Sequence, residues 1–351
     1  MIRVAINGFG RIGRQAFKVW FDRHREEMSI VAVNDLTDAA VLAHLLKYDS
    51  VYGNWNHDVG GQKLVDDIKT ADDGQQVGKL AVDGQEIAVY ATKEPEKLPW
   101  KDLGIDVVCE STGRFTKKED VGKHIAAGAK KVVISAPGKE TPTFLSGVNE
   151  EKYAGEDIIN NASCTTNCIA PVARVMNDAF GIKKAMMTTI HAVTAEQNLV
   201  DGPPPGGKSA DLRRARAAYV NIIPTTTGAA IATGEAIPAL SGKFDGVALR
   251  VPVICGSISD FTFLLKTRVT VEVVNRALSE AARGALAGIL AVSDEPLVSS
   301  DIIGRSESSI VDLSLTRVVD GDMVKVFAWY DNEFGYSNRL IEQVIKVGNA
   351  K

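Results

Sequence analysis

A cysteine and a glycine-rich run, far apart in the chain, are the residues whose types and spacing point most directly to chemistry. Cys164 lies in the stretch Ser-Cys-Thr-Thr-Asn-Cys at 163–168, where it would begin a helix, and Gly8, Gly10 and Gly13 form a Gly-x-Gly-x-x-Gly run. A sulfur nucleophile can hold the carbonyl carbon of an aldehyde while a nicotinamide takes its hydride. Together the two motifs predict a catalytic thiol beside a bound dinucleotide.

A lone cysteine is more often a buried, inert thiol, so Cys164 needs a means of activation. Lowering a cysteine pKa from about 8.5 to about 6 requires about 3.4 kcal/mol of preferential anion stabilisation. A helix N-terminus supplies at most about 2 kcal/mol. We therefore expect a second source, most simply a histidine that can be cationic beside the thiolate. His191, at the centre of a predicted strand, is the candidate.

Two other residues of the same segment are expected to be structural. Cys168 lies about one helical turn after Cys164, which puts their Cβ atoms about 5 to 6 Å apart, too far for a relaxed disulfide. Pro171 lacks a backbone donor and is expected to interrupt or kink the helix.

The glycine run has the context of a dinucleotide-binding motif. It follows a predicted strand at 2–7, opens a helix from Arg11, and precedes a second strand that ends at Asn34 and Asp35. Glycines let the backbone approach a pyrophosphate at a helix N-terminus, and the carboxylate of Asp35 can accept hydrogen bonds from the ribose diol. The alternative is that the glycines serve only a tight turn. The carboxylate favours NAD over NADP, whose extra phosphate it would repel.

Composition bounds the function classes. The chain has 351 residues, 45% of them hydrophobic and 24% charged, with a formal net charge of -4. This length favours two domains, and the charge balance lacks the basic excess of a general nucleic-acid binder. The four cysteines are too few for a disulfide scaffold, and we find neither a leader nor an apolar run of membrane length. We expect a cytoplasmic protein that does not contact membranes and holds no metal.

The two halves of the chain have different patterns. Short apolar runs alternate with helical periodicity in the first half, with further strands at 106–110 and 131–135, a hairpin turn at Asp83 and Gly84, and a polar loop at 66–78. The second half is rich in β-branched residues at 185–194, 246–265 and 309–330, with a helix at 271–283 and a turn at Asp320 and Gly321. The predicted fold class is α/β, with a Rossmann dinucleotide-binding domain and an α+β catalytic domain whose sheet is mainly antiparallel. The predicted bounds are 1–163 for the first domain, completed by a C-terminal helix at 332–351, and 164–331 for the second.

Several longer stretches resemble the phosphorylating glyceraldehyde-3-phosphate dehydrogenases over essentially the whole chain. They lie at 6–14, 44–50, 110–115, 163–168, 212–217, 222–229 and 329–337. The resemblance implies that Cys164 attacks the aldehyde, that His191 takes the proton, and that hydride leaves the thiohemiacetal for NAD. Inorganic phosphate would then cleave the thioester to an acyl phosphate.

The resemblance also implies the binding residues and a homotetramer. The substrate phosphate is expected near Thr194 and Arg250, and the attacking phosphate near Ser163, Thr165, Arg216, Thr227 and Gly228. The residues expected to bind NAD are Asn7, Phe9, Gly10, Arg11, Ile12, Asp35, Lys93, Ser111, Thr112, Ser135, Asn332 and Tyr336.

A few positions depart from the family pattern. Glu196 stands where many relatives carry threonine, which would place a carboxylate near an anionic substrate, and the loop at 201–210 is longer than usual. An alternative activity is that of an erythrose-4-phosphate dehydrogenase, which uses the same fold and thiol but releases a free acid by attack of water. A nucleic-acid role, suggested by Arg213, Arg214 and Arg216, is not expected to be primary, because such a cluster more often forms a solvated or subunit-facing surface.

Overall fold

The computed structural model describes residues 1–203 and 211–350. They form two compact units. The first contains residues 1–143, 153–162 and the chain from Ser337 onwards, and the second contains residues 144–152 and 163–336. Residues 204–210, which hold most of the predicted long loop, lie outside the described residues.

The predicted βαβ unit is present at the start of the first unit. Strand β1 (Ile2–Asn7) leads into helix α1 (Arg11–Arg23), and strand β2 (Met28–Asn34) then pairs with β1 in parallel. The apolar stripe of α1 is buried, with Phe17 and Trp20 almost inaccessible to solvent. Burial of this stripe fixes the helix against the sheet, so its N-terminus lies directly after the end of β1.

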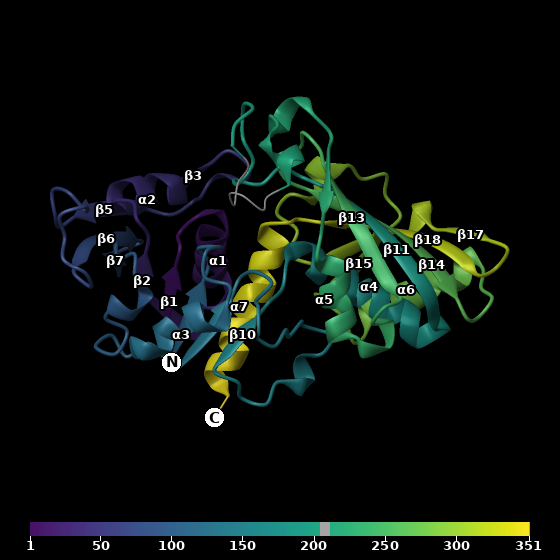
Figure 1. Ribbon diagram of the computed structural model, residues 1–351, viewed down its shortest axis with the longest axis horizontal. Coiled ribbons are helices and arrows are strands. Elements are labelled where there is room, and N and C mark those ends of the chain that lie inside the picture. Colours follow the sequence, from purple (N-terminus) through teal and green to yellow (C-terminus); the bar gives the residue numbers. More distant parts are fainter. Residues whose placement is uncertain (204–210, 351) are drawn as a thin grey trace. The chain divides into compact units, whose positions relative to one another are not determined.

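The sheet of the first unit is parallel around β1 and antiparallel at one edge. Its strand order is β10-β9-β8-β1-β2-β7-β6-β5, and the pairs from β10 to β7 are parallel. The remaining elements of this unit are α2 (Ala39–Lys47), β3 (Tyr48–Asp49), β4 (Gly53–Asn54), β5 (Val59–Lys63), β6 (Gln76–Val82), β7 (Gln85–Tyr90), β8 (Val107–Glu110), α3 (Lys118–Ala126), β9 (Lys131–Ile134) and β10 (Ile158–Asn160) (Figure 1).

The antiparallel edge tests two turn and loop predictions. β6 and β7 form the predicted hairpin, in which Asp83 and Gly84 have φ values of 47° and 83°, as a two-residue turn of this type requires. The predicted loop at 66–78 is wrong at its end, because β6 begins at Gln76. Val77 is buried there although its neighbours are polar.

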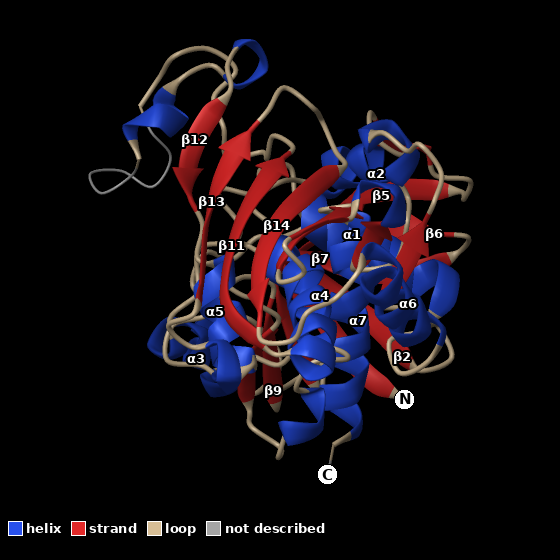
Figure 2. Cartoon of the chain, turned by 90° about the vertical axis from the view of Figure 1, so that its right-hand side faces the viewer, coloured by secondary structure: helices blue, strands red, loops and turns tan. Residues whose placement is uncertain are grey.

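The sheet of the second unit is mainly antiparallel, which confirms the predicted fold class. Its order is β12-β13-β11-β14-β18-β16-β15, with β17 also paired to β18; only β11 with β13 and β15 with β16 are parallel. Figure 2 shows β12, β13, β11 and β14 side by side. The strands are β11 (Ile182–His191), β12 (Ile223–Thr226), β13 (Phe244–Arg250), β14 (Ser257–Leu265), β15 (Leu290–Ser293), β16 (Ser309–Asp312), β17 (Arg317–Val319) and β18 (Met323–Tyr330).

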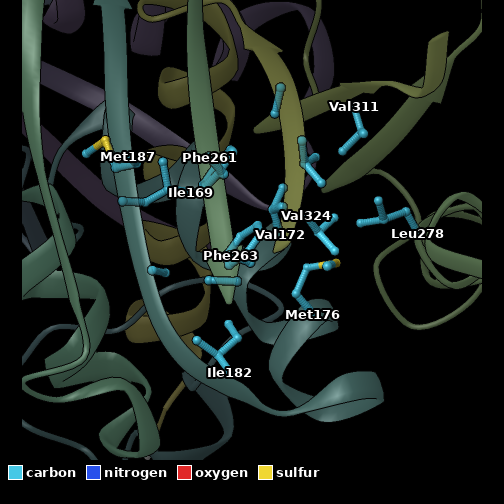
Figure 3. Packing of buried hydrophobic residues seen from close by; sticks show 14 of the residues in the cluster. Ile169, Val172, Met176, Ile182, Met187, Phe261, Phe263, Leu278, Val311 and Val324 are labelled. Atoms are coloured by element: carbon cyan, nitrogen blue, oxygen red, sulfur yellow. The ribbon is translucent and has the colours of Figure 1, made fainter. Parts of the chain in front are cut away.

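Helices α4 (Cys164–Phe180), α5 (Ala229–Ala236) and α6 (Val271–Arg283) pack with this sheet. Figure 3 shows Val172 and Met176 of α4 gathered with Phe261 and Phe263 of β14 and with Leu278 of α6. Alternate residues of β14 are buried, as expected for a sheet with one covered face. Only side chains on the strand face that points to α4 can therefore reach the start of that helix.

Two helices differ from expectation or extend it. α4 runs without a break through Pro171, so the predicted interruption is wrong; the proline is buried and its neighbours Ile169 and Val172 belong to the core, whose packing outweighs the missing donor. α7 (Phe334–Asn349) begins in the second unit, and from Ser337 its residues belong to the first, where Leu340 and Ile341 are buried. None of the described helices has the length and apolar character needed to span a bilayer.

Candidate active site

Cys164 is the first residue of α4, and the local sequence explains why the helix begins there. The side chain of Ser163 accepts a hydrogen bond from the backbone N–H of Thr166, an N-cap that replaces an acceptor missing at the helix start. The thiol therefore lies where the unpaired N–H groups of the first turn converge. The N–H of Thr165 is one of the donors that stabilise the thiolate.

His191 reaches this thiol from the last residue of β11. Met187, Thr189 and His191 alternate on the face of β11 that is buried against the helices. The Nε2 atom of His191 lies 3.4 Å from the Sγ atom of Cys164. The structure thus brings together the two predicted catalytic residues, which are 27 positions apart in the chain.

Arg250 completes the cluster, because β13 pairs in parallel with β11 and sets Arg250 opposite His191. The Nδ1 atom of His191 lies 2.6 Å from the carbonyl oxygen of Ala192 and 2.7 Å from a terminal nitrogen of Arg250, which also donates to that carbonyl at 2.9 Å. A proton on Nδ1 is donated to Ala192 and leaves Nε2 free to accept the thiol proton. In the other tautomer, the proton is on Nε2 and faces the sulfur, and Nδ1 accepts a hydrogen bond from Arg250.

Burial dominates the electrostatics of the pair. Burial raises the pKa of Cys164, and the positive charge of Arg250 and the N–H of Thr165 oppose that rise. Burial and the same arginine lower the pKa of His191 to about 3. Burial first, and the charge of Arg250 second, therefore favour a neutral His191, in contrast to the cationic histidine expected from the sequence. A neutral imidazole is the form that can accept a proton.

Three buried donors near this cluster have no partner among the described residues. They are Thr194 Oγ1, Arg250 Nε and Gln197 Nε2. Gln197 lies beside Thr194, since its Oε1 accepts the N–H of Thr194 at 3.1 Å. Buried donors without acceptors are costly, so this group is suited to an anionic ligand. Thr194 and Arg250 were predicted for a phosphate, whereas Gln197 was missed, since nothing in a glutamine side chain signals such a role.

The arginines of the 212–217 segment separate into one that lies near the cluster and two that do not. Arg214 donates to Glu196 at 2.7 Å and to Thr225 at 3.0 Å, and the same carboxylate lies 3.9 Å from Arg250. Arg216, the predicted phosphate residue, instead pairs with Asp201 at 2.7 Å, with both side chains more than half exposed. The structure therefore places Arg214, not Arg216, beside Arg250.

The same pairs bear on the nucleic-acid alternative. Arg213 contacts Asp211 at 3.0 Å, so each of the three arginines faces a carboxylate. Their charges are locally compensated, which weakens any attraction to a phosphate backbone.

The other residues predicted for the attacking phosphate lie at two helix starts. Ser163 caps α4, and the hydroxyl of Thr165 lies 3.0 Å from the hydroxyl of Tyr330. Thr227 and Gly228 precede α5, which packs against α4, and the N–H of Ala229 donates to Thr227. No carboxylate lies in the first turn of either helix, so both ends are open to an anion.

The first unit contains a cavity of about 610 Å³ at the carboxyl ends of β1, β2 and β8. It brings together six of the predicted NAD residues. They are Asn7, Gly10, Asp35, Lys93, Ser111 and Thr112. This is the edge at which open α/β sheets bind ligands.

The glycines of the run have separate tasks. Gly8 has a φ of 92°, and a Cβ on it would lie 2.6 Å from the backbone nitrogen of Thr112. A Cβ on Gly13 would lie 2.1 Å from the carbonyl oxygen of Gly8, so helix and strand approach only without a side chain. Gly10 faces open space at the start of α1, where N–H groups point outward. This arrangement fits a pyrophosphate.

Four other predicted NAD residues have different surroundings. The ring of Phe9 is buried and packs against Phe17 with centroids 5.5 Å apart, so only its backbone faces the loop. Arg11 pairs with Asp49 at 2.8 Å, Ile12 is partly buried in α1, and Ser135 follows β9 and donates its N–H to the carbonyl of Glu110.

The last two predicted NAD residues belong to the second unit. Both are buried; Asn332 follows β18, and Tyr336 lies in the first turn of α7.

A buried polar chain below the cavity was not foreseen. The Nδ2 atom of Asn7 donates to Glu110 at 2.6 Å, the backbone N–H of Thr112 donates to the same carboxylate at 2.8 Å, and His124 lies 3.0 Å from it. Trp100 donates to the other ring nitrogen of His124. Glu110 thus forms hydrogen bonds with both Asn7 and Thr112, which line the cavity.

The remaining cysteines, Cys109, Cys168 and Cys255, are buried. Burial raises the pKa of both Cys109 and Cys168 to about 12. Across residues 1–203 and 211–350, no group of three histidine, cysteine or acidic side chains is arranged to hold a metal ion.

The chain matches known proteins over nearly its whole length. Residues 2–118 match the family model "Glyceraldehyde 3-phosphate dehydrogenase, NAD binding domain", and residues 163–332 match its C-terminal domain. The chain is 50% identical to glyceraldehyde-3-phosphate dehydrogenase 2 of Streptomyces avermitilis over 99% of both chains. It is 52% identical to glyceraldehyde-3-phosphate dehydrogenase 1 of Bacillus subtilis and 51% identical to the Geobacillus stearothermophilus enzyme, in both cases over 97% of this chain and 96% of the relative. The chain belongs to the glyceraldehyde-3-phosphate dehydrogenase family.

Proposed function

We propose that this protein oxidises D-glyceraldehyde 3-phosphate to 1,3-bisphosphoglycerate with NAD and inorganic phosphate. The observation that carries the proposal is the contact of 3.4 Å between the Cys164 sulfur and the His191 Nε2 atom at the start of α4. A thiol with a base at this distance can form a covalent bond with an aldehyde carbon.

The first step uses only residues of the second unit. The Cys164 sulfur forms a bond to the aldehyde carbon, and its proton passes to the Nε2 atom of His191. The imidazole then returns this proton to the substrate oxygen, which gives a thiohemiacetal. Donors at the N-terminus of α4 stabilise charge on the sulfur before the attack and on the oxygen during it.

The second step oxidises the bound carbon. His191 accepts the hydroxyl proton again while hydride leaves the carbon, and a thioester remains on Cys164. NAD supplies the hydride acceptor in this step. An oxygen of inorganic phosphate then attacks the thioester carbon, and the sulfur leaves as the thiolate, which the N–H of Thr165 and the charge of Arg250 stabilise.

Two sets of donors support the phosphate groups. Thr194, Gln197 and Arg250 would hold the phosphate of the substrate, because three buried donor atoms of these residues lack partners in the described chain. Ser163, Thr165, Thr227, Gly228 and Arg214 would receive the attacking phosphate at the starts of α4 and α5. An arginine suits either task, since its planar fork can bind two phosphate oxygens.

The cofactor fits the first unit. The glycine run, the open end of α1 and the cavity with Asp35 would hold the pyrophosphate and the adenosine ribose. Asn332 and Tyr336 of the second unit would contribute to the nicotinamide side.

The test is NADH formation from glyceraldehyde 3-phosphate and NAD, followed by absorbance, with phosphate, with arsenate, or with neither anion. We expect turnover that requires one of the two anions. Turnover that is independent of both would mean that water resolves the thioester, and erythrose 4-phosphate would then be the substrate to examine.

We also propose that the protein works as a homotetramer in the cytoplasm. The face of the second sheet opposite α4 carries apolar side chains that are only partly covered in the single chain, among them Ile258, Phe327 and Trp329. Covering such a face is a common reason for assembly. Light scattering of the purified protein tests this, and a mass of one chain would contradict it.

A further inference from the structure

The hydroxyl of Ser257 lies between a residue of the catalytic cluster and a residue of the proposed cofactor site. Its Oγ atom is 3.0 Å from the backbone nitrogen of Ala192 and 2.8 Å from the Oδ1 atom of Asn332. All three residues belong to the second unit and are almost completely buried, with exposed fractions of 1% for Ser257, 0% for Ala192 and 3% for Asn332. Water therefore does not compete with these two hydrogen bonds.

The chemistry of a hydroxyl fixes the direction of both bonds. A backbone N–H can only donate, so Ser257 must accept from Ala192. The single hydroxyl proton of Ser257 then goes to Asn332, whose atom at this contact must be the carbonyl oxygen. The thiol of Cys255 lies 3.9 Å from the same oxygen, and its closer acceptor is the Oδ1 atom of Asp331 at 3.2 Å. The amide orientation of Asn332 follows from these partners.

The amide nitrogen of Asn332 is left with a defined direction and no partner among the described residues. Both hydrogen bonds of this side chain are made by its oxygen. This NH₂ group can therefore donate to a carbonyl oxygen of a bound molecule. The carboxamide of a nicotinamide carries such an oxygen.

The two hydrogen bonds that join Ala192, Ser257 and Asn332 form a relay, and its Ala192 end contacts the catalytic base. The N–H of Ala192 is fixed by Ser257, while its carbonyl oxygen lies 2.6 Å from the Nδ1 atom of His191 and 2.9 Å from Arg250. The position of this one residue therefore helps to set the ring of His191 relative to Cys164. A shift of the peptide would alter the contact of 3.4 Å between Nε2 and the sulfur.

We propose that Ser257 is a positioning residue that couples the amide orientation of Asn332 to the placement of His191. The proposal rests on the proposed function, in which Asn332 faces the nicotinamide and His191 is the base. Ser257 contacts neither the substrate nor the reacting atoms. It aligns the hydride acceptor and the proton acceptor through two adjoining hydrogen bonds.

The test compares Ser257→Ala with Ser259→Ala in the full-length protein. Ser259 lies two residues further along β14 on the same buried face, with an exposed fraction of 0%, and its hydroxyl is 3.9 Å from the sulfur of Cys168. Its loss removes a buried hydroxyl without touching Ala192 or Asn332. Calorimetry with NAD and with ADP-ribose, which lacks the nicotinamide, separates binding of the two halves of the cofactor.

We expect Ser257→Ala to raise the Kd for NAD roughly fivefold to tenfold, as for the loss of one buried hydrogen bond, and to leave the Kd for ADP-ribose unchanged. Alkylation of Cys164 by iodoacetamide without cofactor should also slow at neutral pH, because His191 is less well placed. Ser259→Ala should change none of these values. Unaltered ADP-ribose binding shows that each variant is folded.

An Asn332→Ala variant distinguishes the failure of this proposal from the failure of the proposed function. If Asn332→Ala weakens NAD but not ADP-ribose, and Ser257→Ala does neither, the relay is refuted while the cofactor assignment stands. If Asn332→Ala leaves the ratio of the two Kd values unchanged, the cofactor assignment is refuted and the relay with it. A double variant no weaker in NAD binding than Asn332→Ala alone would support the coupling.

Discussion

The carboxylate of Glu196 lies 2.7 Å from a terminal nitrogen of Arg214 and 3.9 Å from Arg250. Glu196 is the residue at which the family resemblance implies a threonine, and its charge faces the two guanidinium groups proposed to bind phosphate. In the free chain the carboxylate accepts a hydrogen bond from Arg214 and partly neutralises the charge of both arginines. A phosphate must therefore compete with it.

Glu196→Gln should strengthen substrate binding. We expect the KM for glyceraldehyde 3-phosphate to fall roughly twofold to fivefold, since a partly exposed ion pair contributes about 0.2 to 1 kcal/mol. Steady-state kinetics at saturating NAD and phosphate measures this. Asp320→Asn, which removes a carboxylate from an exposed pair with Arg268, is the charge-matched control. A higher KM in Glu196→Gln would show that the carboxylate aids the substrate.

The two neighbouring arginines should differ in their effects. Arg214→Ala removes a charged donor beside Arg250, and we expect KM for one of the phosphate ligands to rise about tenfold or more. Arg216→Ala breaks only an exposed ion pair with Asp201, and it should change the KM for either phosphate ligand less than about threefold. Kinetics with inorganic phosphate and with aldehyde varied separately identifies which phosphate Arg214 binds. A larger effect of Arg216→Ala would restore the original prediction for that residue.

Cysteine alkylation should be confined to one site near neutral pH. Burial raises the pKa of Cys109 and Cys168 to about 12, so their thiolate fractions remain negligible until the pH approaches that value. Cys255 is buried as well. Burial also raises the pKa of Cys164, but its side chain is partly accessible, and the charge of Arg250 and the N–H of Thr165 oppose that rise. Peptide mass spectrometry after brief iodoacetamide treatment should find the label on Cys164. Cys164→Ser should abolish both label and turnover while NAD still binds. Substantial residual activity would refute the assignment of Cys164 as the nucleophile.

Glu110 offers a test of the buried network below the cavity. Glu110→Gln replaces a carboxylate that accepts from Asn7, Thr112 and His124 by a group that is half donor, so either Asn7 or Thr112 loses its partner. We expect a loss of about 1 to 3 kcal/mol in the free energy of unfolding and weaker NAD binding. Urea denaturation and calorimetry measure the two effects. The exposed Glu86, paired with Lys79 at 2.7 Å, supplies the control Glu86→Gln, which should change stability by less than about 0.5 kcal/mol. Equal effects of the two substitutions would contradict a special role for Glu110.

The sequence predicted those features that depend on local pattern. The strand at 2–7, the helix at 271–283 and the turns at Asp83 and Asp320 follow from alternation, periodicity and turn chemistry within a few residues. The glycine run predicted a dinucleotide site, and Gly8 and Gly13 have steric reasons that depend on their own neighbours, while Gly10 faces open space at the start of α1. Cys164 was predicted at a helix start, and the structure shows that Ser163 caps this helix.

The features that were missed depend on side-chain direction or on distant partners. Arg214 and Arg216 are two positions apart in a short helical turn, and no pattern in the sequence says which of them turns toward Arg250. Glu110, His124 and Trp100 come from different elements, so their hydrogen bonds arise only from the folded sheet and its helix. The start of β6 was not recognised, because Val77 is the single apolar side chain among the glycine, glutamine and lysine residues at 74–79.

Asp35 should set the preference for NAD over NADP. Its side chain lines the cavity of the first unit, and its Oδ2 atom accepts the N–H of Phe9 at 2.8 Å, which holds the carboxylate at the end of β2. A fixed carboxylate can bind the ribose diol and repels a phosphate on the same ribose. Asp35→Ala should raise the Kd for NAD and narrow the ratio of kcat/KM for NAD to that for NADP by roughly tenfold or more, since both the hydrogen bonds and the repulsion disappear. Asp35→Asn retains a hydrogen-bonding side chain without the charge, so it should relieve the repulsion of NADP while preserving more of the NAD affinity than Asp35→Ala. A ratio unchanged in both variants would remove Asp35 from cofactor selection and direct attention to Lys93 on the same cavity wall.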